Sequence, residues 1–395
     1  MAWISAQDPL TEDRAVALAI AQDLRLTALR HEIRAAELAP KGVGLLASPQ
    51  IRIGVRDMAP DLNDPGFTRT NAGLAWTPPK IGAFAHAARV ADARARETSA
   101  QWSAQKARTE AETRVLYRTA ALLDEQRQLA ARAIELREKV LTAVSQQVAA
   151  GLKTRLDRDA AELALAESRV HAEQIRSERL THLVRLGNRT GLAPASFAIA
   201  HSEAALVFSA PTFDREELRK QALTSRPELR GAEARCRLLE LSLAESRRDL
   251  YPWFSSVQLF RRTTQLSGAQ DWGYQVSADI PIFRWKENAM PAARQQLEAC
   301  RASRRAAEAA ITAEVDELVA RLASVSAEIE QHRRTMIELG SKQVESARAM
   351  LASRETDLVE PLLAELRLTG LRQSYVNRLM EFRALEAGLR QALGN

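Results

Sequence analysis

Side chains that could do chemistry are few and scattered in this chain of 395 residues. The six histidines lack the spacing of a nucleophile and its base or of a metal-ligand set; they are His31, His86, His171, His182, His201 and His332. No Gly-rich phosphate loop follows a predicted strand. Paired carboxylates occur only in helical ladders of alternating charge. The sequence therefore predicts that the protein is not an enzyme and that it has no cofactor and no metal site.

Cys236 and Cys300 are the only two cysteines of the chain. No histidine lies near either of them in the sequence, so a metal site has no support. A disulfide between them and a pair of buried, unreacted thiols are both open. We expect the thiols to be free.

The composition is that of a folded, mostly helical protein. Hydrophobic residues make up 46% of the chain, charged residues 27% and aromatic residues only 5%. These proportions are typical of long helices that pack through small side chains. The net charge is +6, but basic and acidic residues are interleaved, as they are from Arg132 to Lys139. This pattern indicates a solvated helix surface rather than a nucleic-acid partner.

Membrane contact, if the chain makes any, is expected through strands. No run of about 18 apolar residues is present, so no transmembrane helix is predicted. Met1 to Leu10 has neither the basic nor the apolar region of a secretory signal, so no signal peptide is visible in this numbering. That absence counts against export unless the start of the chain was trimmed.

Two long segments are almost free of helix breakers. Neither Gly nor Pro occurs from Ala83 to Ala150, so a single helix of about 100 Å is expected at 1.5 Å per residue. The second segment runs from Arg284 to Ser353 and contains only Pro291, close to its start, and Gly340. Such lengths favour a coiled-coil architecture over an ordinary globular core.

An internal repeat relates the two long segments. Pro49 and Pro252 are 203 residues apart, and the same offset separates Leu26 from Leu229. We therefore predict two tandem repeats, 1–203 and 204–395, with an equatorial segment at 188–213. The first repeat is predicted to contain a helix from Thr11 to Ala39, strands at 49–56 and 70–77, a long helix at 82–150 and a return helix at 155–187. The second is predicted to contain a helix at 214–248, strands at 253–262 and 273–282, a long helix at 284–353 and a return helix at 358–391.

All four predicted strands alternate between apolar and polar residues. Ile51, Ile53 and Val55 share one face, and the opposite faces of the strands carry Arg52, Arg56, Gln275, Ser277 and Asp279. The strands approach the 9–11 residues that cross a bilayer when tilted. Four strands cannot close a barrel, whereas three copies would supply twelve. The polar residues are then predicted to face the barrel lumen.

Aromatic residues mark the ends of these strands. Those expected at the helix-side ends, and predicted to lie at the membrane interface, are Trp76, Tyr251, Trp253, Phe283 and Trp285. Phe67, Phe260 and Trp272 lie toward the opposite loops. Two such groups resemble the interfacial girdles of outer-membrane barrels, although scattered core aromatics are the alternative.

Several short motifs together resemble the outer-membrane efflux protein family that includes TolC. They are Ser225-Arg226-Pro227-Glu228-Leu229-Arg230, Glu233-Ala234-Arg235, Asp249-Leu250-Tyr251-Pro252 and Ile280-Pro281-Ile282-Phe283. The resemblance spans nearly the whole chain, from Thr11 to Leu385. The stretch from Leu46 to Asp57 and the motif Trp76-Thr77-Pro78-Pro79 are more similar to the heavy-metal efflux branch than to drug or protein exporters.

The resemblance implies a mainly helical fold with a small β part. Long coiled-coil hairpins and four strands would contribute to a trimeric, twelve-stranded outer-membrane β-barrel above a periplasmic helical tunnel. The implied function is the passive channel of a tripartite efflux or type I secretion system in a Gram-negative cell. The implied partners are outer-membrane lipid, a periplasmic adaptor (membrane fusion) protein and an inner-membrane RND or ABC transporter. A soluble coiled-coil scaffold is the alternative, with no nucleic acid in either case.

The family resemblance also assigns roles at the helix turns farthest from the strands. Gly151, Thr154 and Asp157 match the family pattern in the first repeat, whereas Arg354 occupies the Gly position of the second. These four residues are expected at the tip that docks the adaptor. Asp357 and Glu360 are expected at a pore constriction, where repeated carboxylates favour cations. Acids at the start of a helix also stabilise it through the helix dipole, and both roles can hold.

Overall fold

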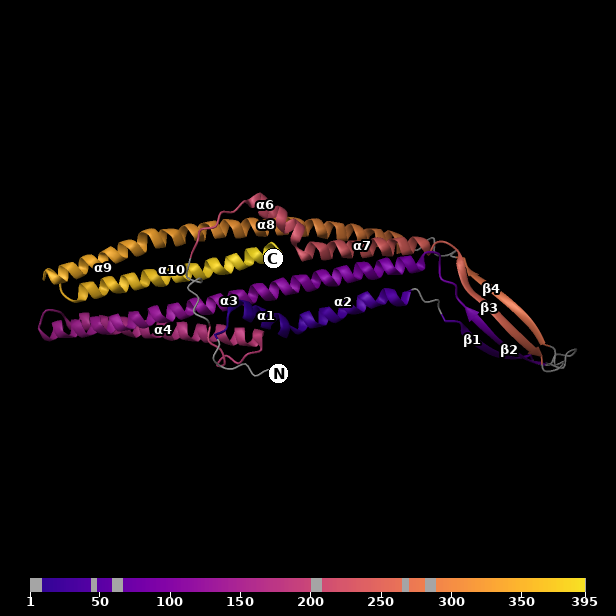
Figure 1. Cartoon of the computed structure of the whole chain (residues 1–395), viewed down its shortest axis with the longest axis horizontal. Helices are drawn as coiled ribbons and strands as arrows, with labels where there is room; N and C mark the ends of the chain where they lie inside the picture. The colour runs from indigo at the N-terminus through magenta and orange to yellow at the C-terminus, as the bar shows by residue number, and fades with distance from the viewer. Residues whose placement is uncertain are drawn as a thin grey trace. The chain divides into compact units, whose positions relative to one another are not determined.

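The computed structural model describes residues 9–43, 48–58, 67–199, 208–264, 270–280 and 289–394. Helices dominate, and four strands form one sheet, as predicted (Figure 1). The helices before residue 200 are α1 (Glu12–Gln22), α2 (Leu24–Val43), α3 (Ala83–Ala149) and α4 (Arg155–Thr190). Those after it are α6 (Arg215–Ser225), α7 (Pro227–Arg248), α8 (Ala289–Gln331), the π-helical turn η2 (His332–Met336), α9 (Ile337–Ala352) and α10 (Val359–Ala392). The strands are β1 (Gln50–Met58), β2 (Phe67–Trp76), β3 (Trp253–Thr264) and β4 (Gln270–Asp279).

The chain divides into two compact units. One, here called the helical unit, comprises Met1–Thr27, Ser103–Pro227 and Glu308–Asn395. The other, the strand unit, comprises Ala28–Trp102 and Glu228–Ala307 and contains the sheet. Each unit takes residues from both predicted repeats, so the compact units are not the repeats 1–203 and 204–395. The repeats and the equatorial segment 188–213 remain predictions.

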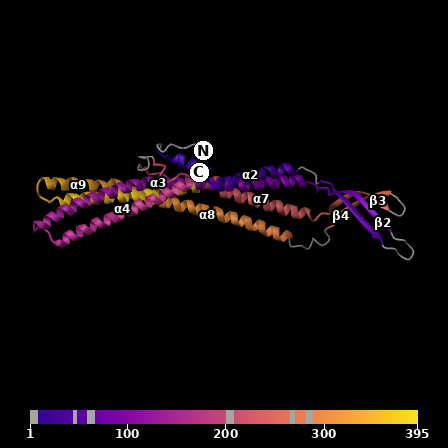
Figure 2. The same cartoon turned by 90° about the horizontal axis from the view of Figure 1, so that it is seen from below.

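In the helical unit, four helices lie side by side in the order α4, α3, α10, α9 (Figures 1 and 2). Three apolar clusters join them: Leu123, Ala130 and Ile175 between α3 and α4; Leu136, Val140, Val359 and Leu362 between α3 and α10; Val344, Ala347 and Ala364 between α9 and α10. Members of a cluster that share a helix are three, four or seven residues apart, which puts them on one helix face. The helices therefore form an open layer whose edge helices are α4 and α9.

The helices of the strand unit follow the same plan. The guanidinium of Arg30 on α2 lies 5.6 Å from the ring centre of Trp102 on α3. A Cβ added at Gly231 of α7 would lie 3.4 Å from the Cβ of Ala100 on α3, so these two helices approach closely. An apolar cluster that includes Leu243 and Leu297 joins α7 to α8. The order is thus α2, α3, α7, α8.

The sheet has the simple order β1-β2-β3-β4, with every neighbouring pair antiparallel. Ile51 is opposite Leu74, Leu74 is opposite Leu259, and Leu259 is opposite Tyr274. The observed strands agree with the predicted ones to within three residues at each end. Among the described residues, β1 and β4 each pair on one side only, so the sheet has two open edges.

Two helices predicted as continuous are broken. The segment from Thr11 to Ala39 is interrupted at Asp23, whose backbone is extended. The carboxylate of Asp23 accepts hydrogen bonds from the backbone N–H of Arg25 at 2.8 Å and from the Thr109 hydroxyl at 2.7 Å. An aspartate that caps the next helix and binds a neighbouring one is better satisfied outside a helix than within it.

The segment 214–248 is likewise interrupted, at Arg226, also in extended conformation. Pro227 follows it, and a residue before proline disfavours the helical region. The predicted long helix 284–353 contains the π-helical turn η2, and its first residues lie outside the described ranges. Asp23 and Arg226 are separated by the same 203 residues as Pro49 and Pro252.

The expectation of free thiols was wrong. Cys236 on α7 and Cys300 on α8 form a disulfide with a Cα–Cα distance of 5.7 Å. The two cysteines are 64 residues apart in the sequence, and that separation alone did not indicate a contact. They meet because β3 and β4, which lie between them, form a hairpin that brings α7 and α8 together.

Within the described ranges, none of the helices combines the length and the apolar character that a membrane-crossing helix needs.

Arg226 connects the end of α10 to α8 within the helical unit. Its buried side chain donates from Nε to the Ala392 carbonyl at 2.7 Å and from Nη2 to Glu314 at 2.6 Å. We predict that Arg226→Ala lowers the free energy of unfolding by about 2–3 kcal/mol, because a buried carbonyl loses its charged donor. Urea unfolding followed by helical circular dichroism measures the change.

Arg219→Ala is the matched control, since Arg219 of α6 also pairs with an acid of α8, Asp316, but is much more exposed. Its loss should cost at most about 1 kcal/mol. Equal effects of the two variants would contradict the prediction.

Candidate functional site

The turn between α3 and α4 is a Schellman turn. Gly151 has a positive φ of 72°. Its N–H donates to the carbonyl of Val148 at 3.0 Å, and the N–H of Leu152 donates to that of Gln147 at 2.8 Å. These bonds satisfy carbonyls that the helix end would otherwise leave free. The turn therefore requires a residue at position 151 that can adopt the left-handed backbone conformation.

The turn between α9 and α10 has the same hydrogen bonds with different side chains. Arg354 has a positive φ of 60°, the only such non-glycine among the described residues. Its N–H donates to Leu351 at 3.1 Å, and the N–H of Glu355 donates to Met350 at 2.9 Å. A non-glycine residue in this conformation costs roughly 1–2 kcal/mol. Arg354 thus occupies a position that favours glycine.

Two acidic residues act as helix caps: Asp157, expected at the tip, and Asp357, expected at the pore constriction. Thr154 and Asp157 form a capping box: the Thr154 N–H donates to Asp157 at 2.8 Å, and the Asp157 N–H donates to the Thr154 hydroxyl at 3.3 Å. Asp357 accepts from the backbone N–H of Val359 at 2.9 Å and from that of Glu360 at 3.3 Å. Each acid satisfies N–H groups at the start of a helix.

A side chain that the sequence did not single out connects the two turns. Gln147 at the end of α3 donates from Nε2 to the carboxylate of Asp357 at 2.8 Å. Burial alone would raise the pKa of Asp357, but the hydrogen bonds from Gln147 and from two backbone N–H groups outweigh it and lower that pKa. The pKa of Asp157 is lowered by hydrogen bonds from the Thr154 side chain and backbone. Both acids are therefore charged near neutral pH.

The other predicted site residues near these turns make fewer contacts. Glu360 lies on the first turn of α10, and its carboxylate is 3.9 Å from Arg367. One turn farther along α10, Glu365 accepts from Arg132 of α3 at 3.0 Å and from Arg348 of α9 at 2.6 Å. Gly151 is exposed, and nothing lies within 4 Å of a Cβ added there. The structure thus brings Asp357 to the end of α3, whereas Asp157 caps its own helix.

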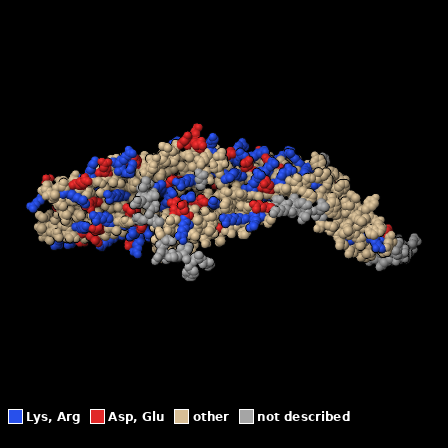
Figure 3. Space-filling model, in the orientation of Figure 1, with Lys and Arg blue, Asp and Glu red and all other residues tan. Residues whose placement is uncertain are grey.

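The sheet has one apolar face. The row Ile51, Leu74, Leu259, Tyr274 runs across all four strands, and these side chains are between 52% and 83% exposed. The same face carries Ile53 and Val55 on β1 and Trp272 and Val276 on β4, all of them exposed. In the space-filling view the strands show few charges, whereas charges of both signs are mixed over the helices (Figure 3). An apolar face this large on a single chain indicates a missing partner or an apolar solvent.

The opposite face of the sheet is polar. Gln275 lies in a cross-strand row with Gln258, and Ser277 is opposite Ser256. Arg52 is on the same face and exposed, and Asp279 ends β4 on it. The side chain of Arg56 lies outside the described part of the structure. The described residues predicted to face the lumen therefore share one face of the sheet.

Phe260 interrupts this polar face at a point where two glycines flank it. In the register Phe260 is opposite Gly73 of β2 and Gly273 of β4. A Cβ added at Gly273 would lie 2.7 Å from the Phe260 ring, which shows that the ring covers that glycine. Phe260 was predicted to lie toward the opposite loops as part of an aromatic girdle; the structure shows its side chain packing over two glycines.

The aromatic residues expected at the membrane interface differ in their surroundings. Tyr251 is 72% exposed, whereas Trp253 is partly buried and donates from Nε1 to the Pro78 carbonyl at 2.9 Å. Trp76 is partly buried at the end of β2. Phe283 and Trp285 lie outside the described residues.

The edge helix α4 carries a second apolar row. Leu165, Ile175, Leu183 and Leu186 are buried. On a different face, Leu156, Leu163 and Val170 are spaced seven residues apart and are 76%, 63% and 59% exposed. A repeat of seven is the spacing of a coiled-coil seam. We call these three residues and Val184 the outer row of α4.

Within the described ranges, no three His, Cys, Asp or Glu side chains are grouped to hold a metal ion.

Solved structures with a similar fold are outer-membrane channels. The channel OprN matches with a TM-score of 0.79 and 18% identity over 97% of this chain and 89% of its own. VceC from Vibrio cholerae matches with a TM-score of 0.75 and 15% identity over 97% and 96%. CmeC from Campylobacter jejuni matches with 0.78 and 12% over 97% and 85%.

The chain has the fold of these outer-membrane channels. The predicted mainly helical fold with a small four-stranded sheet is thereby confirmed, whereas the trimeric barrel and the two repeats remain predictions. No family model and no curated protein matches the sequence itself.

The two turns allow a paired test of the left-handed position. Gly151→Ala should lower the free energy of unfolding by about 1 kcal/mol, because the added Cβ meets no neighbour but strains the backbone. Arg354→Gly should raise it, or leave it unchanged, because the same strain is removed. Thermal unfolding of both variants measures the difference. Effects of the same sign would show that side-chain contacts, not the backbone, decide these turns.

Proposed function

We propose that three copies of this chain form a passive channel through the outer membrane and the periplasm. The observation that carries the proposal is the sheet, which has an exposed apolar face, a polar opposite face and two open edges. In lipid, an apolar face is favourable, but unpaired N–H and C=O groups at an edge are not. The edges therefore need strands from other copies.

The strand order is suited to such a closure. Three antiparallel pairings separate β1 from β4, so these two strands run in opposite directions. β4 of one copy can then pair antiparallel with β1 of the next and continue the up-and-down order. Two copies would give eight strands, a barrel filled by its own side chains, whereas three give twelve and a lumen. A duct needs the latter.

The helical unit supports a ring of the same kind. Its layer α4-α3-α10-α9 has two edges, and the outer row of α4 is an apolar seam with no partner among the described residues. On the other edge, Met336 of η2 and Leu339 and Met350 of α9 are exposed. Packing α4 of one copy against α9 of the next would bury both rows. This supports the homotrimer and a helical tunnel wall.

The residue roles follow from this arrangement. We propose that the polar sheet face with Arg52, Arg56, Gln275, Ser277 and Asp279 lines the lumen. The aromatic residues that we place at the membrane interface are Trp76, Tyr251, Trp253, Phe283 and Trp285. The residues that we place at the periplasmic tip, where an adaptor would dock, are Gly151, Thr154, Asp157 and Arg354. Asp357 and Glu360 would contribute negative charge to a constriction beside that tip.

The two tandem copies are part of the proposal, and the element bounds support them. β2 spans 67–76 and β4 spans 270–279, while α1 spans 12–22 and α6 spans 215–225, so both pairs are shifted by 203. Gly191 and Gly394, after α4 and α10, have φ values of 72° and 78°. In the cell, we propose that a periplasmic adaptor and an inner-membrane RND or ABC transporter deliver the substrate to this channel, as in a tripartite efflux or type I secretion system.

Two adjacent residues on β4 test which face meets lipid. Val276→Arg should remove the protein from the outer-membrane fraction, because an arginine facing the bilayer midplane costs about 2–4 kcal/mol per copy. Gln275→Arg adds the same charge to the polar face. It should leave insertion intact and shift the reversal potential in a planar bilayer toward anion selectivity.

The two variants are matched in strand, depth and added residue, so protein abundance in each membrane fraction is directly comparable. If the unmodified chain and both variants are all soluble and equally stable, the scaffold alternative replaces the channel. If Gln275→Arg blocks insertion and Val276→Arg does not, the faces are assigned the wrong way round.

The outer row of α4 tests the ring. Leu163→Glu should reduce the trimer to a monomer in native mass measurements, because three buried carboxylates would replace three leucines at the seam. Glu162→Gln, at the adjacent exposed position, is the control and should leave the trimer intact. A trimer of undiminished stability with Leu163→Glu would show that α4 faces solvent.

A further inference from the structure

The disulfide joins α7 to α8 at a point where α8 has little other support. Among residues 290–307, the part of α8 described in the strand unit, Leu297 is the single buried side chain. Cys300 is partly buried three residues farther on, and Cys236 is 8% exposed. α8 is also the edge helix of its layer, with α7 as its neighbour. The disulfide therefore lies at a junction with few buried contacts.

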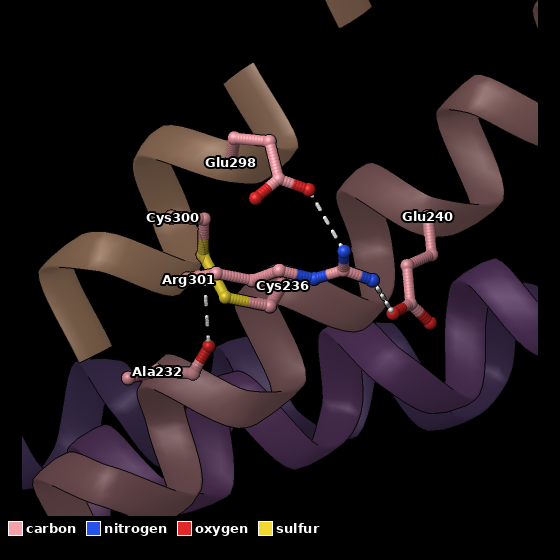
Figure 4. Close-up of a disulfide and its surroundings, with 6 residues drawn as sticks. All are labelled: Ala232, Cys236, Glu240, Glu298, Cys300 and Arg301. Carbon is pink, nitrogen blue, oxygen red and sulfur yellow. Dashed lines mark hydrogen bonds and ion pairs between the residues drawn. A yellow bond between two sulfur atoms is a disulfide. The ribbon is translucent and has the colours of Figure 1, made fainter. Parts of the chain in front are cut away.

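An ionic contact reinforces the same junction. Arg301 of α8 donates from Nη2 to Glu240 of α7 at 3.2 Å and from Nη1 to Glu298 of α8 at 2.8 Å (Figure 4). Glu240 is one helical turn from Cys236 on α7. The Arg301 side chain is half exposed, so this contact is worth little by itself. The covalent bond is the contact that can hold α8 in place.

The cross-link is particular to the second half of the chain. Shifting Cys236 and Cys300 back by 203 residues gives Ile33 and Glu97, which cannot form a disulfide. Between the cysteines lie both strands β3 and β4, so the bond closes the base of that hairpin. A bond that closes so long a loop restricts the unfolded chain strongly.

We infer that the Cys236–Cys300 disulfide is an assembly staple, which forms in an oxidising compartment and fastens the edge helix α8 to α7 before a second copy of the chain packs beside it. In forming it, the two thiols lose two protons and two electrons. A protein thiol–disulfide oxidant of that compartment accepts the electrons and leaves as its dithiol. Such bonds persist in exported proteins and are rare in the cytosol. The role in assembly rests on the proposed trimer; the fastening of α8 does not.

The experiment uses the exported full-length chain, trapped with iodoacetamide and mapped by non-reducing peptide mass spectrometry. One cross-linked peptide pair and no alkylated cysteine are expected. Hydrogen exchange then compares the oxidised protein with Cys236→Ser/Cys300→Ser. Amides at 290–307 should exchange at least about tenfold faster in the double variant, and those of α4 should not change. Trimer formation from diluted subunits should slow several-fold.

Glu298→Gln is the matched control, because it removes one arm of the Arg301 contact and leaves both thiols in place; exchange should change less than twofold. Alkylated cysteines in the exported protein would overturn the inference. So would equal exchange at 290–307 in the oxidised and double-serine proteins. If the double-serine variant assembles as fast as the parent, the disulfide has no role in assembly, and the proposed channel function is unaffected. If the protein is a monomer and still shows the exchange difference, the disulfide fastens α8 as inferred, but the proposed trimer is wrong.

Discussion

Unpaired backbone groups along β1 and β4 are the constraint on which the rest of this molecule depends. Each edge strand leaves a row of N–H and C=O groups without partners in the part of the chain that the structure describes, and the face beside them is apolar. In water such a sheet would associate at its edges, and in lipid an open edge cannot persist at all. Both environments lead to the same result. A sheet of this design needs more strands, and in the arrangement we propose another copy of the chain supplies them in the right direction.

Apolar burial, rather than the many ion pairs, decides how the helices pack. Arg132 and Glu135 are 2.7 Å apart, but both side chains are close to half exposed, so their pairing contributes about 0–1 kcal/mol. Burying Leu136 nearby contributes roughly 1.5–3 kcal/mol. Arg118 differs, because it is largely buried between Glu12 and Glu386. Burial lowers its pKa, but its hydrogen bonds to these carboxylates and their negative charges raise that pKa by more, so Arg118 stays charged and loss of either partner is costly.

Helices and strands could be predicted from sequence patterns with a short period. Features that depend on contacts between residues distant in the sequence could not. The absence of Gly and Pro from Ala83 to Ala150 predicted α3 to within one residue, and alternation located all four strands. The break at Asp23 was missed because its cause is Thr109, which lies on another helix. The disulfide was missed for the same reason. Of the tip, the sequence identified Gly151 and the acids but not Gln147, whose amide has no signal until α3 and α10 are side by side.

The two turns at the helix ends show what the fold requires there and what it leaves free. Their hydrogen bonds are the same, although glycine is present in one and arginine in the other. The backbone conformation is therefore the fixed element, and the side chains can vary. Thr154 and Asp357 both cap the return helices, so the charge of Asp357 is already committed to backbone N–H groups and to Gln147.

Glu360 is different, because its carboxylate caps neither return helix and lies 3.9 Å from the cation Arg367. The donors to Asp157 and Asp357 are neutral groups, so their hydrogen bonds hold these carboxylates in place and leave their negative charge. If the copies of this turn surround a pore, Asp157 and Asp357 would add a fixed negative potential, and Glu360 would be the acid whose side chain can turn toward a cation. The caps would then hold the turn in shape, and one acid per copy would be left to contact the solute.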